Sequence, residues 1–349
     1  MLAAATTARS VVWAIRFKEG VSAGMATNGT TCGWSAPRIG PRRSRRRPPW
    51  SEKGSRRGCS RPAGWVPGGR IGWSRRCDRD VMREIDLTRA HPGRVYDYFL
   101  GGKDNYAADR EAAAALAKAL PDIPRMARAN RDFLRRAVRR LVGVCGVRQL
   151  IDIGSGIPTS PNVHEIAQEI DPGARVVYVD NDPLVGAHSR ALLTSSAAGA
   201  VEFLLADVTD PAAVIGDARL RAAVDLAEPV GLLLVSVLMY FTDEVVGEVV
   251  DTLVGALAPG SFVVVSHPTG DFAPEVMARA AAVGKKSGLT YLARSRDQVE
   301  GLFAGLALCP PGVVAMPEWH PRACAVGSSA GLAASTHYWV GVARKRPDG

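Results

Sequence analysis

The feature that most constrains the fold is a regular alternation of short apolar runs and helical segments from residue 149 onward. The apolar runs are rich in Val, Leu and Ile, which is typical of buried strands. The segments between them carry helical spacing or start signals such as Asp210-Pro211. Strands alternating with crossover helices predict an α/β fold with a doubly wound parallel sheet. We expect its strands at residues 149–153, 175–179, 201–205, 230–235, 261–266, 313–316 and 337–343.

Two helical segments precede this region. Residues 106–120 are rich in Ala with mixed charges, and residues 125–142 place apolar side chains close to one helical face. We therefore divide the ordered sequence into a helical part at residues 82–148 and an α/β core at residues 149–349. Further helices are expected to start at Ser160-Pro161 and Asp210-Pro211 and to cover residues 183–196, 243–257, 273–286 and 295–304.

The first 80 residues have a different composition. They carry 17 Lys and Arg against 4 Asp and Glu, whereas residues 81–349 carry 27 against 30. Like charges at this density repel, and the scattered apolar residues offset little of the entropy lost on ordering. We expect residues 1–81 to be a disordered basic tail, or a stretch translated from upstream of a true start at Met82. A basic arm that binds nucleic acid is the alternative interpretation.

Composition also bears on the cellular setting. None of the six Cys is spaced as C-x-x-C, and the six His are dispersed, so neither a disulfide framework nor a metal site is expected. The longest apolar run, residues 230–241, is shorter than the ~20 residues that a membrane span needs. The N-terminus lacks the pattern of a secretory signal. We therefore expect a cytoplasmic protein without a membrane partner.

Carboxylates lie at the ends of three successive predicted strands. Asp152 precedes Gly154 and Gly156 at the first strand-to-helix turn. Asp180 ends the second strand, and Asp207 follows the third. Ligands of such sheets lie beyond the carboxyl ends of the strands, and glycines let them approach the backbone. A carboxylate at the second position can accept both hydroxyls of a ribose, and one at the third can accept from the adenine amine. The pattern predicts a nucleoside site.

Two nucleoside cofactors compete for this site. A dinucleotide needs G-x-G-x-x-G, whereas the run from Gly154 is G-S-G-I-P-T and lacks the third glycine. Asp152 would repel a pyrophosphate but suits the ammonium and sulfonium groups of S-adenosyl-L-methionine. The residues favour S-adenosyl-L-methionine, with an NAD-dependent oxidoreductase as the alternative enzyme. A non-catalytic cofactor-binding or regulatory protein on the same fold is the alternative outside enzymes.

Residues 85–345 resemble the class I S-adenosyl-L-methionine-dependent methyltransferases. Within them the sequence is similar to a little-characterised bacterial family of S-adenosyl methyltransferases, once a domain of unknown function. The resemblance is carried by H-P-G-R-V-Y-D-Y at 91–98, L-G-G-K-D-N-Y at 100–106, A-N-R at 129–131, the Asp152 turn, N-V-H-E at 162–165 and Y-V-D-N-D-P at 178–183. It implies a Rossmann-like sheet of seven strands with the last antiparallel, and N-terminal helices that cap the cofactor.

The resemblance also assigns roles to residues. The turn at Gly154 and Gly156 would pass under the methionine moiety and ribose, and Asp152 would order it or meet the ammonium group. The methionine carboxylate needs a cation or an amide partner, although a tight loop with a solvent-facing Lys explains the glycine pair before Lys103 equally well. The expected cofactor-binding residues are Asp152, Gly154, Gly156, Asp180, Asn181, Asp207, Val208, Ser236, Lys103, Asn105 and Arg131.

The acceptor and the chemistry are less constrained. Residues 82–349 carry no net basic surface, so a small-molecule acceptor is favoured over nucleic acid. His267 follows the fifth strand and is the candidate general base, with Asp271 four residues on to orient it. The alternative is that His267 only packs or caps the following helix. Tyr96 and Tyr98 alternate at a spacing of two and are candidates for the mouth of the substrate site, with a packing role as the equal alternative. Similar sequences commonly carry His where this chain has Met239.

The tail hypothesis leads to a testable prediction. A chain beginning at Met82 is expected to fold and to bind S-adenosyl-L-methionine as the full chain does, because the charge and periodicity change near residue 80. Circular dichroism and calorimetry of both chains measure this. A loss of binding in the shorter chain would contradict the prediction.

Overall fold

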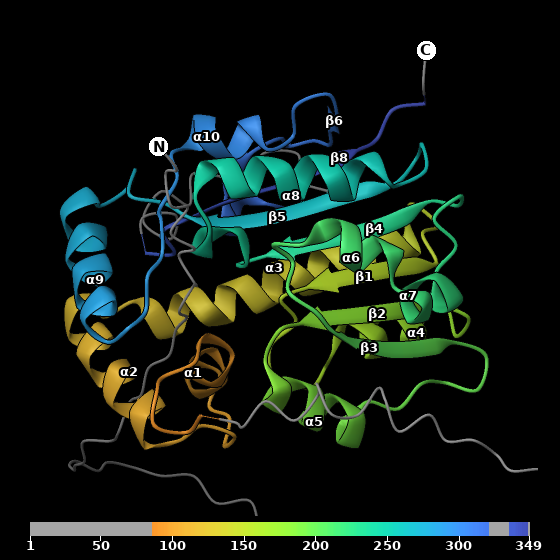
Figure 1. Cartoon of the computed structure of the whole chain (residues 1–349). Coiled ribbons are helices and arrows are strands. Elements are labelled where there is room, and N and C mark those ends of the chain that lie inside the picture. Colours follow the sequence, from red (N-terminus) through yellow and green to blue (C-terminus); the bar gives the residue numbers. More distant parts are fainter. Residues whose placement is uncertain (1–85, 321–334, 348–349) are drawn as a thin grey trace, which may run out of the picture. The chain divides into compact units, whose positions relative to one another are not determined.

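A computed structural model describes residues 86–320 and 335–347 (Figure 1). All of them belong to one unit of the chain. The expectation for the tail at 1–81 lies outside the described residues. No helix among the described residues is long and apolar enough to cross a membrane.

The described residues form helices and strands in the predicted alternation. The helices are α1 (Pro92–Phe99), α2 (Ala107–Ala119), α3 (Ile123–Gly143), α4 (Val163–Ile170), α5 (Pro183–Leu192), α6 (Pro211–Gly216), α7 (Ala218–Ala223), α8 (Asp243–Gly255), α9 (Pro274–Lys286) and α10 (Arg296–Gly301), with 3-10 turns η1 (Leu238–Tyr240) and η2 (Met316–Glu318). The strands are β1 (Gln149–Ile153), β2 (Arg175–Asp180), β3 (Ala200–Leu205), β4 (Val230–Val235), β5 (Phe262–Pro268), β6 (Ala307–Leu308), β7 (Val314–Ala315) and β8 (Tyr338–Arg344).

The strands form a single sheet in the order β3-β2-β1-β4-β5-β8-β6, and β7 pairs with β8 outside this path. Strands β1 to β5 are parallel, and β8 runs antiparallel to its neighbours. This confirms the predicted doubly wound fold with an antiparallel last strand. The described sheet has eight strands where seven were expected, because the two-residue strand β6 was not predicted. The strand order reverses between β1 and β4, which is therefore the switch point.

Side chains of successive strand residues enter two separate cores. In β1, Leu150 packs into the core beneath α3 and α4, whereas Ile151 and Ile153 pack into the core beneath α6, α7 and α8. In β2, Val176 and Val177 divide in the same way. This period of two follows from the pleat of a strand. Helices cover both faces of the sheet (Figure 1), so the strands are buried on both sides and appear in the sequence as continuous apolar runs.

Helix starts show where local sequence signals compete. Asp210 caps α6 as predicted, and its side chain accepts from the N–H of Ala213 at 3.0 Å. The helix expected at Ser160-Pro161 begins later, at Val163. Asn162 is its N-cap, and the Glu165 carboxylate accepts from the Asn162 N–H at 2.5 Å. A reciprocal capping box satisfies two helix-end N–H groups, so it prevails over the earlier Ser-Pro signal.

The helices before the core fulfil the expectation of an N-terminal helical part. Helix α3 buries one apolar face, on which Phe133 contacts Trp319 edge-to-face at a ring-centroid distance of 5.1 Å. Arg139 lies on the exposed face and pairs with Glu169 at 2.7 Å. The helix is thus a packed amphipathic element that carries Asn130 and Arg131 toward the switch point.

Candidate functional site

The turn between β1 and α4 holds two glycines in a left-handed conformation. Gly154 has φ +69° and Gly156 has φ +67°, values that residues with a Cβ rarely adopt. A Cβ on Gly154 would also lie 2.6 Å from Cγ2 of Val237, in the segment after β4. The turn therefore needs glycine there and leaves bare backbone beside the switch point.

Asp180 ends β2 and faces this turn. Its Oδ2 accepts a hydrogen bond from the N–H of Gly156 at 2.8 Å, and its Oδ1 accepts from the N–H of Asp182 at 3.0 Å. Burial raises the pKa of Asp180, while the neighbouring His91 acts in the opposite direction. The structure thus brings together Asp180 and the glycine turn, which are far apart in the sequence.

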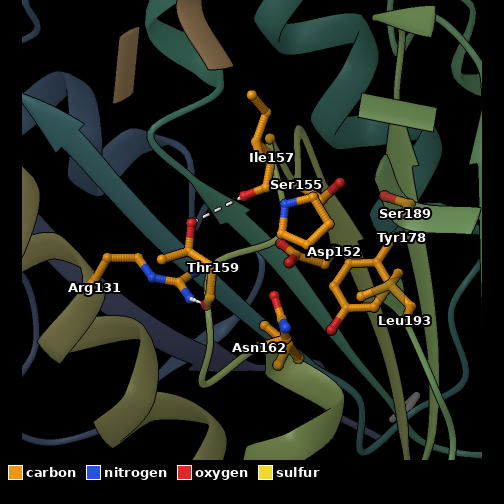
Figure 2. Close-up of a pocket in the computed structure, with 12 residues that line it drawn as sticks. Arg131, Asp152, Ser155, Ile157, Thr159, Asn162, Tyr178, Ser189 and Leu193 are labelled. Carbon is orange, nitrogen blue, oxygen red and sulfur yellow. Dashed lines mark hydrogen bonds between the residues drawn. The ribbon is translucent and has the colours of Figure 1, made fainter. Parts of the chain in front are cut away.

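Asp152 is buried in β1, two residues before the turn. Asp152, Arg131 and Tyr178 line a cavity of about 10 Å³, which has room for about one water molecule. Figure 2 shows Asp152 next to Tyr178, with Arg131 approaching from α3. Burial raises the pKa of Asp152 to about 7, the Arg131 guanidinium lowers it, and Asp180 raises it. The carboxyl group is therefore partly protonated near neutral pH, and a nearby cation would favour its ionised form.

Arg131 and Ser155 approach the same cavity from different elements. The Arg131 Nη2 donates to the carbonyl oxygen of Thr159 at 2.7 Å (Figure 2) and to that of Pro161 at 2.9 Å, so it joins α3 to the loop before α4. The Ser155 Oγ is buried and has no hydrogen-bond partner in the part of the chain that the structure describes. Such a group costs about 1–3 kcal/mol, so Ser155 marks a position where a polar ligand atom or a water would be stabilising.

Asn181, Asp207 and Val208 lie together at the ends of β2 and β3. The Asp207 Oδ2 accepts from Nδ2 of Asn181 at 3.2 Å, and its Oδ1 accepts from the N–H and hydroxyl of Thr209 at 3.0 and 2.8 Å. Asp207 is exposed, whereas the Val208 side chain packs into the core. The structure thus places Asn181 in direct contact with Asp207.

The loop between α1 and α2 is organised around Asp97. The Asn105 Nδ2 donates to Oδ2 of Asp97 at 3.0 Å and to the carbonyl oxygen of Gly102 at 3.1 Å. A Cβ on Gly102 would overlap the Asp97 carboxylate. Both amide hydrogens of Asn105 are thus used inside the loop, and we revise its role from a carboxylate ligand to a residue that shapes the loop. Lys103 is exposed and forms no hydrogen bond or ion pair with the described residues.

His267 lies in β5 with a fully buried side chain. Its Nδ1 is 2.9 Å from the carbonyl oxygen of Pro268, and its Nε2 is 2.7 Å from Nη1 of Arg294. Because Arg only donates, Nε2 accepts and the ring is the neutral Nδ1–H tautomer. Burial lowers the pKa of His267 to about 3. Both ring nitrogens are used inside the protein, so the geometry does not fit the predicted general base.

The predicted partner of His267 also has another role. The Asp271 Oδ2 accepts from Nε1 of Trp339 at 2.7 Å and from the N–H of Arg296 at 2.8 Å. It therefore fastens the loop after β5 to β8 and α10 and does not orient His267. The expectation that Asp271 orients the imidazole is wrong.

A polar network that the sequence did not indicate joins the cap to β4, β5 and β8. Ser236 has φ 56°, and its Oγ donates to the Tyr338 hydroxyl at 3.0 Å. The Ser266 Oγ donates to Oδ1 of Asn130 at 2.7 Å, and Nδ2 of Asn130 donates to the Tyr96 hydroxyl at 2.8 Å. Asn130 and Ser266 are 136 residues apart, so no local pattern could have linked them.

The sheet order, the glycine turn at its switch point and the acids near the carboxyl ends of β1, β2 and β3 define a class I S-adenosyl-L-methionine-dependent methyltransferase fold. The family model described as S-adenosyl methyltransferase matches residues 78–346. The chain therefore belongs to the S-adenosyl methyltransferase family.

Solved structures agree with this family. A DUF574 family protein from Streptomyces avermitilis MA-4680 is 41% identical, with a TM-score of 0.71, and the match covers 75% of this chain and 100% of that one. A proposed methyltransferase from Thermobifida fusca YX is 36% identical, with a TM-score of 0.69, over 75% of this chain and 97% of that one. None of the curated proteins compared with the chain matches it.

Proposed function

We propose that the chain binds S-adenosyl-L-methionine across the carboxyl ends of β1, β2 and β3 and methylates a small-molecule acceptor. The observation that carries the proposal is Asp180, whose half-buried carboxylate accepts from the N–H of Gly156 in the left-handed glycine turn at 2.8 Å. A carboxylate at this position can accept from two vicinal hydroxyls. Exchanging its backbone partners for ribose hydroxyls would need only local adjustment of the turn.

The adenine end of the cofactor fits the pair at the ends of β2 and β3. Asp207 is exposed and can accept from the exocyclic amine of adenine. The adjacent backbone N–H of Val208 would donate to a nitrogen of the adenine ring. The side-chain amide of Asn181 already donates to the Asp207 carboxylate at 3.2 Å. These contacts select an adenine over a ring without an amine.

The methionine end fits the opposite side of the glycine turn. Asp152 is buried, and a cationic ammonium or sulfonium nearby would favour its ionised form. Arg131 comes from α3 to the cavity beside Asp152 and is the candidate partner of the methionine carboxylate. The unpaired Oγ of Ser155 provides a further polar contact. Lys103 would join this group only if its exposed loop closed over the cofactor.

The charge of Asp152 argues against a dinucleotide. Asp152 is buried and lies two residues before the turn on which a pyrophosphate would have to rest. Bringing two phosphate charges beside it would add repulsion. A ligand with a sulfonium and an ammonium would gain attraction from the same carboxylate, which is why we favour it over NAD, whereas Asp180 could bind the ribose of either cofactor.

Methyl transfer in this site depends on alignment. Bound S-adenosyl-L-methionine supplies an electrophilic methyl group on a sulfonium, to which an acceptor lone pair forms a bond as the carbon–sulfur bond breaks. The pairs Tyr96–Asn130 and Ser236–Tyr338 are joined through Ser266 into a neutral polar network that would hold an acceptor in line. With His267 buried, these residues orient the acceptor rather than deprotonate it.

A thermal-shift comparison tests the cofactor. S-adenosylhomocysteine at about a hundred times its Kd should stabilise the folded chain by ~2.7 kcal/mol, or roughly 5–10 °C in Tm. NAD at the same concentration should leave Tm unchanged, because its pyrophosphate would lie near Asp152 at a turn that lacks the third glycine of a dinucleotide site. Stabilisation by NAD without stabilisation by S-adenosylhomocysteine would overturn the proposed function.

A further inference from the structure

Helix α1 lies directly against the glycine turn of the candidate cofactor site. A Cβ built on Gly93, at the start of this helix, would lie 3.5 Å from the Cα of Gly156 and 3.6 Å from Cγ2 of Val185. The backbone of α1 therefore lies within van der Waals reach of the backbone of the turn at this point. The N-terminal end of α1 is therefore part of the wall of the site.

His91 is the residue that immediately precedes α1. Its backbone N–H donates to Oδ1 of Asp109 at 2.9 Å, which fixes the start of the helix to α2. Its ring Nδ1 lies 2.9 Å from Oδ2 of Asp182. The side chain is 24% exposed, and none of the described residues bonds Nε2. Nδ1 is thus in close contact with a carboxylate, and Nε2 is left for a ligand.

The carboxylate that holds His91 is itself fixed. The Asp182 Oδ1 accepts from the N–H of Leu184 at 2.9 Å and caps α5. The Asp182 N–H donates to Oδ1 of Asp180 at 3.0 Å. His91 therefore reaches the same short segment that carries the ribose-binding candidate. The influence of His91 on the pKa of Asp180 agrees with this proximity.

We propose that His91 is a further cofactor-binding residue, whose Nε2 hydrogen-bonds a ribose hydroxyl of S-adenosyl-L-methionine opposite Asp180. The inference rests on the proposed function, because it needs the cofactor ribose at the end of β2. Asp182 acts as the positioning residue, since its contact with Nδ1 fixes the orientation of the ring. The ribose would then be held between β2 and the N-terminal helices.

The competing explanation is that His91 only fastens α1 to the loop after β2. Two substitutions separate these roles. His91→Ala removes both nitrogens, whereas His91→Asn keeps a polar atom near the Nδ1 position for Asp182 and loses Nε2. His188→Ala is a matched control, because His188 is also 24% exposed and lies 3.9 Å from a carboxylate, that of Asp104.

The experiment is calorimetry of the full chain with S-adenosylhomocysteine and with its 2′-deoxy and 3′-deoxy analogues. Loss of a hydrogen bond predicts roughly five- to tenfold weaker binding of S-adenosylhomocysteine by both His91 variants. Against the analogue that lacks the bonded hydroxyl, both variants should bind as well as the wild type. His188→Ala should match the wild type throughout. Circular dichroism of each variant verifies folding, and His91→Asn carries the test if His91→Ala is unfolded.

Other outcomes overturn the inference in distinguishable ways. Wild-type affinity in His91→Asn, or an equal loss for all three ligands, would show that His91 only fastens the helix. If the wild type does not bind S-adenosylhomocysteine, or Asp180→Ala binds it unchanged, the proposed cofactor site itself fails. A normal effect of Asp180→Ala with no effect at His91 overturns this inference alone.

Discussion

The free energy of unfolding is expected to decrease steeply as the pH is lowered from 6.5 toward about 3, because His267 is buried as a neutral ring. Its pKa in the folded chain lies below the ordinary value, so in this window the unfolded chain binds a proton that the folded chain does not. The stability contributed by His267 is fully present above pH 6.5 and is lost as the pH falls. The slope should be about 1.4 kcal/mol per pH unit, and the total on the order of 5 kcal/mol.

Urea unfolding of the wild type and His267→Gln at several pH values between about 7.5 and about 4 measures this slope. Gln keeps an acceptor for Arg294 but does not titrate, so its curve should lack the His267 contribution. Asp152 has the opposite sign: its raised pKa makes stability fall as the pH rises from 3.8 to about 7. That contribution is common to both proteins and cancels in their difference. Parallel curves would show that His267 titrates as a free imidazole and would restore it as a candidate base.

Asp180→Ala should weaken the binding of S-adenosyl-L-methionine strongly without unfolding the chain. Loss of a charge-assisted pair of hydrogen bonds to the ribose costs about 1.5–3 kcal/mol, or roughly 10- to 150-fold in Kd. The carboxylate ends a strand and its burial raises its pKa, so the folded chain gains little from its charge. Calorimetry with S-adenosylhomocysteine measures the loss, and circular dichroism verifies the fold.

The matched control for this prediction is Asp271→Ala. Asp271 also follows a strand at the same edge of the sheet, but it bonds Trp339 and Arg296 and lies outside the proposed cofactor contacts. Its substitution should leave cofactor affinity unchanged. Equal affinity of Asp180→Ala and the wild type would remove Asp180 from the site, whatever the control shows.

Much of the fold could be predicted because it is encoded locally. Buried parallel strands produce continuous apolar runs, and the predicted strand at 149–153 coincides with β1. The start of α4 was predicted at the wrong residue. Ser160-Pro161 and the capping box at Asn162 are both local signals for a helix start, and the helix uses the second of them. The two-residue strand β6 has too few residues for a periodic pattern, and it exists only because β8 lies beside it.

The candidate cofactor residues at strand ends could also be predicted. Parallel strands that neighbour one another in a sheet end at the same edge, so Asp180 and the glycine turn had to approach each other once the topology was known. The glycine turn could be predicted as well, because few residues other than glycine adopt the left-handed backbone conformation at low cost.

What the sequence by itself determined is therefore the doubly wound sheet, the glycine turn and the row of acids, all of which follow from short-range patterns and the topology that they imply. Only the tertiary structure decided which polar side chains remain available at that edge. The His267 ring accepts a hydrogen bond from Arg294, 27 residues away, and the Asn105 side chain donates to Asp97. His91 is held beside Asp180 by Asp182, far along the chain. The physical reason is that burial and hydrogen-bond partners depend on packing between distant segments, which residue spacing does not encode.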